Sequence, residues 1–254
     1  MDAAADDSRA VTPFGFVGLC LSLAALAGIG LLVAFVIGAI GAVCVGLVLG
    51  WQAMMEAARA MLALRDDDTG RRALFVALIV FHVGLSVAIF LMARWRGGTA
   101  WRDLIGWRGF RLADKTIWVI MAGALIYSAL ANSALEHVLP HPAVQLTIPA
   151  DLVASAALFA LAVIVAPVTE ELLFRGWIYT GLRFHWGLWP ALLTTSALFA
   201  GAHYESTHLY ALAVFPIGLA LGIIRERTGS IKASILFHAA NNFVALALAA
   251  LSRG

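Results

Sequence analysis

Two adjacent glutamates and an arginine lie in one strongly apolar segment, APVTEELLFRGWIY at 166–179. An ionised carboxylate in hydrocarbon costs roughly 3 kcal/mol or more, so such residues usually face a cavity or a partner. In a helix, Glu171 and Arg175 are four residues apart on one face and can form an ion pair. Pro167 cannot donate a helical hydrogen bond and should bend the helix near the acids. Glu170 points about 100° away from the paired face, which leaves it available for chemistry.

Two later apolar segments each bring an imidazole. His203 ends the segment PALLTTSALFAGAH, and Phe199, four residues earlier, should pack beside it. His238 and Asn242 are also four residues apart on one face, whereas Asn241 is turned away by about 100°. A bundle that joins the three segments would hold a carboxylate, two imidazoles and an amide around one cavity. These groups supply a general base, proton carriers and a hydrogen-bond donor, which indicates a catalytic or ion-binding centre.

Each of these features also has a structural interpretation. A lone Glu–Arg pair in a membrane helix more often joins helices than catalyses a reaction, and a lone histidine usually forms interhelical hydrogen bonds. The histidines in or beside loops are given no role: His137, His141, His185 and His208. The functional interpretation is favoured because three apolar segments each carry ionisable or amide groups and little else that is polar.

The composition of the whole chain fits a membrane protein. Hydrophobic residues make up 62% of its 254 residues, charged residues 13%, and the mean hydropathy is +0.92. A soluble domain has about 45–50% apolar and about 25% charged residues, and it could not bury this much apolar surface. The net charge of +2 and the lack of basic runs do not indicate a nucleic-acid partner. We therefore expect an all-α fold, a polytopic bundle of transmembrane helices.

The expected spans are apolar runs of about 20 residues, long enough to cross a bilayer. They lie near residues 73–93, 117–136, 152–173, 188–203, 209–224 and 231–251. The first apolar run, from Pro13 to Trp51, is predicted to form one long tilted helix, with a hairpin as the alternative. About seven spans result, within a range of roughly six to eight. Residues 1–12 would form a polar tail before a single membrane-embedded domain at 13–254, with the site between the last four helices.

Lysine and arginine concentrate on one side of this topology. That side holds the N-terminus, the Trp- and Arg-rich loop at 94–116 and the turn at 225–232. The positive-inside rule places it in the cytoplasm, and the 94–116 loop is typical of an interfacial segment. Because the chain is rich in Ala and Arg, we expect a bacterial origin and location in the cytoplasmic (inner) membrane.

The three motifs, in this order on consecutive apolar segments, resemble those of the CPBP family. They are Glu170-Glu171-x-x-x-Arg175, Phe199-x-x-x-His203 and His238-x-x-x-Asn242. This family contains CAAX-type prenyl endopeptidases together with bacteriocin-processing and abortive-infection membrane proteins. The lead-in R-x-R-T-G-S-I-x-A-S-I at 225–235 is also similar to the approach to the family's third motif. The resemblance covers about 150–245, and the N-terminal half is similar only in being helical and apolar.

The resemblance implies proteolysis within or at the membrane, on a peptide or protein substrate. In the family's usual mechanism, Glu170 and His203 would activate a water molecule, and His238 and Asn242 would stabilise the oxyanion. The other motif residues would support the site structurally: Glu171, Arg175 and Phe199. The alternatives are a non-catalytic bacteriocin-immunity or scaffold protein of the same fold and a proton-coupled transporter. The transporter would need an inverted repeat, which the sequence does not show.

A metal could also take part in this chemistry. Glu170, His203 and His238 make a plausible zinc shell with an open position for water. However, the sequence has no H-E-x-x-H motif, and asparagine is an uncommon zinc ligand. A water activated by glutamate alone fits the residues equally well. We slightly favour the metal-free chemistry and assign no cofactor.

Overall fold

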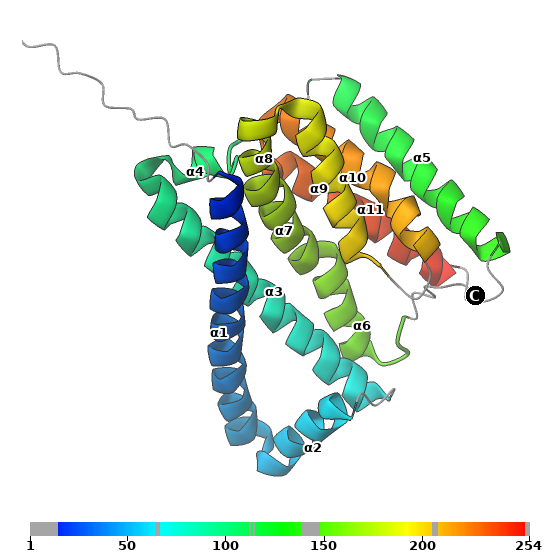
Figure 1. Cartoon of the computed structure of the whole chain (residues 1–254). Helices are drawn as coiled ribbons and strands as arrows, with labels where there is room; N and C mark the ends of the chain where they lie inside the picture. Colours follow the sequence, from blue (N-terminus) through cyan, green and yellow to red (C-terminus); the bar gives the residue numbers. More distant parts are fainter. Residues whose placement is uncertain are drawn as a thin grey trace, which may run out of the picture.

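The computed structural model describes residues 15–63, 67–111, 113, 115–138, 148–204 and 208–251. This part of the chain is built of helices and contains no β-strand (Figure 1), which confirms the all-α prediction. The polar tail predicted at 1–12 lies outside the described residues. Four of the described helices are long and apolar enough to cross a membrane: Phe16–Leu49, Asp68–Leu104, Leu152–Trp186 and Ile231–Leu251. The protein is therefore an integral membrane protein, and seven spans remain a prediction.

The first apolar run forms a single helix, α1 (Phe16–Leu49), as predicted. Its 34 residues correspond to about 50 Å at 1.5 Å per residue, which exceeds the roughly 30 Å of bilayer hydrocarbon. A shorter helix, α2 (Trp51–Leu62), connects it to α3 (Asp68–Gly97). In Figure 1, α1 and α3 cross and then diverge toward α2, so the three helices enclose a triangle. Asp67 caps α3 by accepting a hydrogen bond of 2.8 Å from the Gly70 amide.

Two glycines allow α1 and α3 to cross closely. A Cβ atom at Gly84 would lie 2.7 Å from the Gly30 carbonyl oxygen and 2.8 Å from the Ala34 backbone nitrogen. A Cβ atom at Gly30 would lie 3.2 Å from Leu85. Small residues at such crossings let membrane helices pack backbone to backbone. The N-terminal helices are thus joined to the rest of the bundle through this contact on α3.

Substituting Gly84 with alanine is expected to destabilise the protein by about 1–3 kcal/mol, because the new methyl group would overlap backbone atoms that cannot move aside. The measurement is thermal unfolding in detergent followed by circular dichroism. Gly28→Ala on α1 is the matched control, because a Cβ atom there meets nothing within 4 Å. Equal melting temperatures for the two variants would contradict the close crossing.

The C-terminal half supplies the helices that surround the motifs. They are α5 (Lys115–Val138), α6 (Leu152–Phe159), α7 (Ala166–Glu171), α8 (Tyr179–Trp186), α9 (Leu188–Ala202), α10 (His208–Thr228) and α11 (Ile231–Leu251). In Figure 1 the helices from α6 to α11 form one bundle, with α5 along its outer side. The span predicted at 152–173 is too short, because the helical run continues to Trp186. The helical run continues past Arg175, whose side chain is buried inside the bundle and paired with Glu171.

Two π-helical segments flank α7, the helix that carries both glutamates. They are η2 (Ala160–Val165) and η3 (Leu172–Ile178). At the end of η2 the Ala166 amide donates to the Leu161 carbonyl, and at the end of η3 the Tyr179 amide donates to the Phe174 carbonyl. Each of these bonds spans five residues instead of four. Such π segments occur frequently at functional sites, and the sequence pattern did not indicate them.

Polar contacts with α3 fix the start of this run. Asp151 caps α6 by accepting a hydrogen bond of 2.7 Å from the Ala154 amide, and Arg72 of α3 donates to the same carboxylate at 2.8 Å. The Arg72 guanidinium, with the Ala154 amide, lowers the pKa of Asp151 to about 2. Asp151 therefore stays ionised and keeps α6 attached to α3.

The Trp- and Arg-rich segment after α3 packs against the turn that precedes α11. It contains η1 (Gly98–Ala100) and α4 (Trp101–Leu104). The Ile231 amide donates to the Gly106 carbonyl at 2.9 Å, and the Ser230 hydroxyl donates to the Arg108 carbonyl at 2.6 Å. Ser230 also caps α11, which begins at Ile231 as predicted. This segment is thus part of the protein's packing as well as a candidate interfacial region.

Candidate active site

The predicted ion pair between Glu171 and Arg175 is present and fully buried. Arg175 Nη1 donates to Glu171 Oε1 at 2.9 Å, and the two side chains are 1% and 0% exposed. Arg175 Nη2 donates to the Gly218 carbonyl of α10 at 2.8 Å. The guanidinium carbon also lies 4.4 Å from the centroid of the Phe199 ring, where cation–π attraction is favourable. The pair therefore joins α7, α9 and α10 while neutralising its own charges.

His238 of α11 connects this pair to the second glutamate. Its Nδ1 lies 3.0 Å from Glu171 Oε1, and its Nε2 lies 3.7 Å from Glu170 Oε2. Because an ionised carboxylate only accepts hydrogen bonds, Nδ1 carries a proton. Nε2, the other ring nitrogen, therefore faces Glu170.

His203 approaches the same oxygen from the end of α9. Its Nδ1 donates to the Phe199 carbonyl at 2.8 Å, because a carbonyl can only accept. Its Nε2 lies 3.7 Å from Glu170 Oε2. The structure thus brings together the glutamate and both histidines that the sequence analysis singled out, although they come from three different helices.

Glu170 and His203 are partly open to solvent, with side chains 21% and 29% exposed, whereas His238 is 5% exposed. Glu170 Oε2 is buried, and no described residue donates a hydrogen bond to it. The distance of 3.7 Å to each imidazole exceeds a hydrogen bond. A water molecule placed to one side could lie about 2.8 Å from both Glu170 Oε2 and an imidazole Nε2. Such a water would contact the carboxylate and an imidazole together.

A cavity of about 80 Å³ adjoins the cluster. This volume is large enough to hold water. Its lining includes the predicted site residues Phe199, His203, His238 and Asn242 together with Asn241. The remaining lining residues come mainly from α5 and α10: Ser128, Ala131, Ala213, Val214, Ile217 and Ala245. Helix α5 thus contributes to the cavity from the outside of the bundle.

The two asparagines of α11 both line this cavity. Asn242 lies on the face of His238, as predicted, and its Nδ2 donates to the Ala162 carbonyl at 2.8 Å. Asn241, rotated by about 100° from that face as expected, is nevertheless buried and lines the same cavity, with its Nδ2 3.5 Å from Asn242 Oδ1. The inward stripe of a buried helix is wider than 100°, so adjacent residues can both reach the interior.

Phe199 packs against the imidazole as predicted and supports several members of the site. Its ring centroid lies 4.6 Å from that of His203 and 5.6 Å from that of His238. It also makes an edge-to-face contact of 5.3 Å with Phe174, a favourable aromatic geometry. The aromatic ring thus fixes both imidazoles against the Glu171–Arg175 pair.

Thr169 and Ser86 also position the acids, and the sequence analysis did not identify either. The Thr169 hydroxyl lies 2.8 Å from the Ser86 hydroxyl and 3.1 Å from the His82 carbonyl, both on α3. It also lies 3.0 Å from the Val165 carbonyl. Thr169 directly precedes Glu170, so these contacts hold the glutamate's backbone against α3. Their signal in the sequence, single hydroxyls in apolar runs, is too common to interpret.

The predicted zinc ligands, Glu170, His203 and His238, face one another. As they stand, however, the described residues contain no group of three or more His, Cys, Asp or Glu side chains that could hold a metal ion. The zinc set therefore remains a prediction, and the mechanism below routes no step through a metal.

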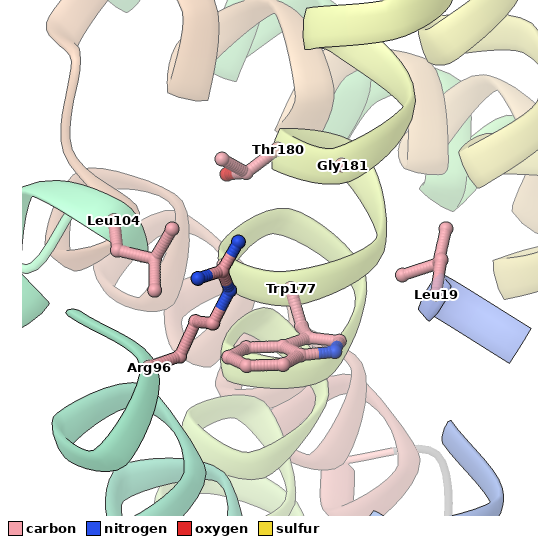
Figure 2. A pocket seen from close by; sticks show the side chains of 7 residues that line it. Leu19, Arg96, Leu104, Trp177, Thr180 and Gly181 are labelled. Atoms are coloured by element: carbon pink, nitrogen blue, oxygen red, sulfur yellow. The ribbon is translucent and has the colours of Figure 1, made fainter. Parts of the chain in front are cut away.

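A second, smaller cavity of about 10 Å³ lies between α1, the end of α3, α4 and η3. Figure 2 shows its lining, in which Arg96 and Trp177 are the largest side chains, with Leu19, Leu104 and Thr180 around them. The Trp177 indole donates to the Ser22 hydroxyl of α1 at 2.8 Å. None of the predicted site residues lines this cavity, so it is a packing feature that connects α1 to the bundle.

The apolar helices and the buried cluster define a membrane protein with a group of ionisable side chains inside its helical bundle. Residues 152–244 match the family model described as type II CAAX prenyl endopeptidase Rce1-like. This segment, which carries all three motifs, is thus similar to the Rce1-like family, as the resemblance implied, while the N-terminal helices lie outside the match. The family supports a CAAX-type intramembrane protease fold.

A relative from Escherichia coli is similar over a shorter stretch of the chain. An uncharacterised 24.3 kDa protein from Escherichia coli is 38% identical over 78 residues, which is 30% of this chain. The alignment spans only 36% of that protein's length. No solved structure matches the chain.

Proposed function

We propose that the protein is an intramembrane endopeptidase that hydrolyses a peptide bond of a membrane-associated protein or peptide. One observation carries this proposal: Glu170 Oε2 is buried, takes no hydrogen bond from the described residues, and lies 3.7 Å from Nε2 of both His203 and His238. Glu171 Oε2 is also buried without a hydrogen-bond partner, but the other oxygen of Glu171 is held by Arg175 and His238; Glu170 is distinguished by facing two imidazole nitrogens at the same distance. The Rce1-like match supports the same class of activity.

In this mechanism Glu170 is the general base. It accepts a proton from a water in the adjoining cavity, and the resulting hydroxide attacks the carbonyl carbon of the substrate peptide bond. His203 Nε2 lies close enough to share this water. The proton then passes to the nitrogen of the leaving peptide, which restores the ionised glutamate.

His238 is suited to the developing negative charge on the substrate. When its Nε2 is protonated, the Glu171 carboxylate on Nδ1 stabilises the positive imidazolium ring. The Nε2–H group could then donate a hydrogen bond to the oxyanion of the tetrahedral intermediate. Arg175 compensates the charge of Glu171, so the supporting pair remains neutral while His238 changes its protonation state.

The proposal is tested by cleavage in detergent micelles. Synthetic peptides, farnesylated and unmodified at a C-terminal cysteine motif, are mixed with purified protein and the products are identified by mass spectrometry. His203→Ala is expected to lower the rate by about 100-fold or more, since acid–base partners contribute at least that much. His185→Ala is the control, because His185 is exposed and outside the cavity. A zinc chelator should leave the rate unchanged, and full activity of His203→Ala would contradict the mechanism.

A further inference from the structure

The Ala162 carbonyl beside the site lacks both its α-helical and its π-helical donor. At the end of η2 the Ala166 amide donates to Leu161, five residues back, and so does not bond the Ala162 carbonyl. The next donor in this register would be the amide of residue 167. That residue is proline, which has no N–H group. The π segment and the proline together therefore remove both of these hydrogen-bond donors from the Ala162 oxygen.

Asn242 of α11 supplies the missing donor. Its Nδ2 lies 2.8 Å from the Ala162 oxygen, and the amide nitrogen must face that atom because a carbonyl only accepts. In a membrane, a helix that contains proline is tolerated when neighbouring helices satisfy the freed backbone groups. An unsatisfied carbonyl at this depth would instead cost the desolvation free energy of a polar group.

We propose that Asn242 replaces the absent amide of Pro167 and thereby positions Glu170 relative to His238. Ala162 and Pro167 lie in the same helical run as Glu170, which follows the proline by three residues. Asn242 lies one turn after His238 on α11. The Asn242–Ala162 hydrogen bond thus joins the two helices whose side chains approach to 3.7 Å. Asn242 is a positioning residue in this proposal, in contrast to the oxyanion-binding role that the family resemblance implies.

The two roles differ in their dependence on Pro167. If Asn242 compensates for the proline, a residue with an amide hydrogen at 167 makes it dispensable. If Asn242 contacts the oxyanion, the residue at 167 is irrelevant to its contribution. Double-mutant cycles measure such dependence directly.

The experiment combines Asn242→Ala with Pro167→Ala, and in parallel with Pro167→Leu, in the full chain. Two readouts are used: the melting temperature in detergent and kcat for the peptide substrate described above. With Pro167 present, Asn242→Ala should lower the melting temperature and reduce kcat by about tenfold or more, with KM little changed, since a buried acceptor loses its donor. In either Pro167 variant, the same change should cost less than about twofold in kcat and leave the melting temperature unchanged.

Asn241→Ala is the matched control, because this neighbouring amide does not contact Ala162 and its effect should be the same in both backgrounds. An equal loss of kcat for Asn242→Ala with and without Pro167 would overturn the proposal and favour oxyanion binding. Failure of both Pro167 variants to fold would also overturn it, since a restored amide should fit the helix. The kinetic readout rests on the proposed endopeptidase function, whereas the melting temperatures do not. If no variant cleaves any peptide, the proposed function fails while the stability cycle still decides this inference.

Discussion

Substituting Glu170 with glutamine is expected to lower kcat for peptide hydrolysis by about 10²–10⁴-fold, the usual contribution of a general base. Glutamine has nearly the same shape as glutamate but cannot accept the proton of water at neutral pH. The folded structure should tolerate the change, because Glu170 Oε2 makes no hydrogen bond with the described residues. Melting temperatures in detergent should therefore remain similar while activity is lost.

Glu56→Gln is the control for this substitution, because Glu56 lies exposed on α2, far along the chain from the motifs. It should retain the activity of the unmodified protein. Measured cleavage by Glu170→Gln at the unmodified rate would rule out Glu170 as the base. A loss of activity together with a large fall in melting temperature would instead indicate a structural role.

The sequence indicated which polar residues gather inside the bundle, because ionisable residues are costly in a membrane and usually face a partner or a cavity. Helical spacing alone separated Glu171, which pairs with Arg175, from Glu170, which does not. The same spacing placed Phe199 beside His203. These relations depend only on the geometry of one helix, so they could be derived without knowledge of the fold.

Relations between helices were less accessible from the sequence. His203 lies at the C-terminal end of α9, as its segment predicted, but its sequence did not indicate that its Nε2 and that of His238 would lie at the same distance from Glu170. Meeting at one depth depends on how far each helix is displaced along the bundle, which hydrophobic patterns do not specify. The π segments around α7 were also missed, because one extra residue per turn changes no residue type. These segments shift the backbone hydrogen bonds next to Ala162, and the proposed role of Asn242 depends on that shift.

Substituting Arg175 with methionine is expected to destabilise the protein by about 3–5 kcal/mol, because Glu171 would be left charged and unpaired in the interior. The Glu171 side chain is 0% exposed, so water cannot compensate the lost partner. Thermal unfolding in detergent provides the measurement. Arg183→Met is the matched control, since its pair with Glu226 is partly exposed, 41% and 32%, and such pairs contribute about 1 kcal/mol or less.

Removing both charges of the buried pair should cost less than removing Arg175 alone. In Glu171→Gln/Arg175→Met no ionised group remains unpaired, and the glutamine oxygen can still accept the hydrogen bond of 3.0 Å from His238 Nδ1. The double variant should therefore regain much of the stability, but it should have low activity, because neutral glutamine no longer stabilises a protonated His238. Restored stability and full activity together would show that the charge of Glu171 is unnecessary for catalysis. Double and single variants of equal stability would contradict the unpaired charge as the cause of the destabilisation.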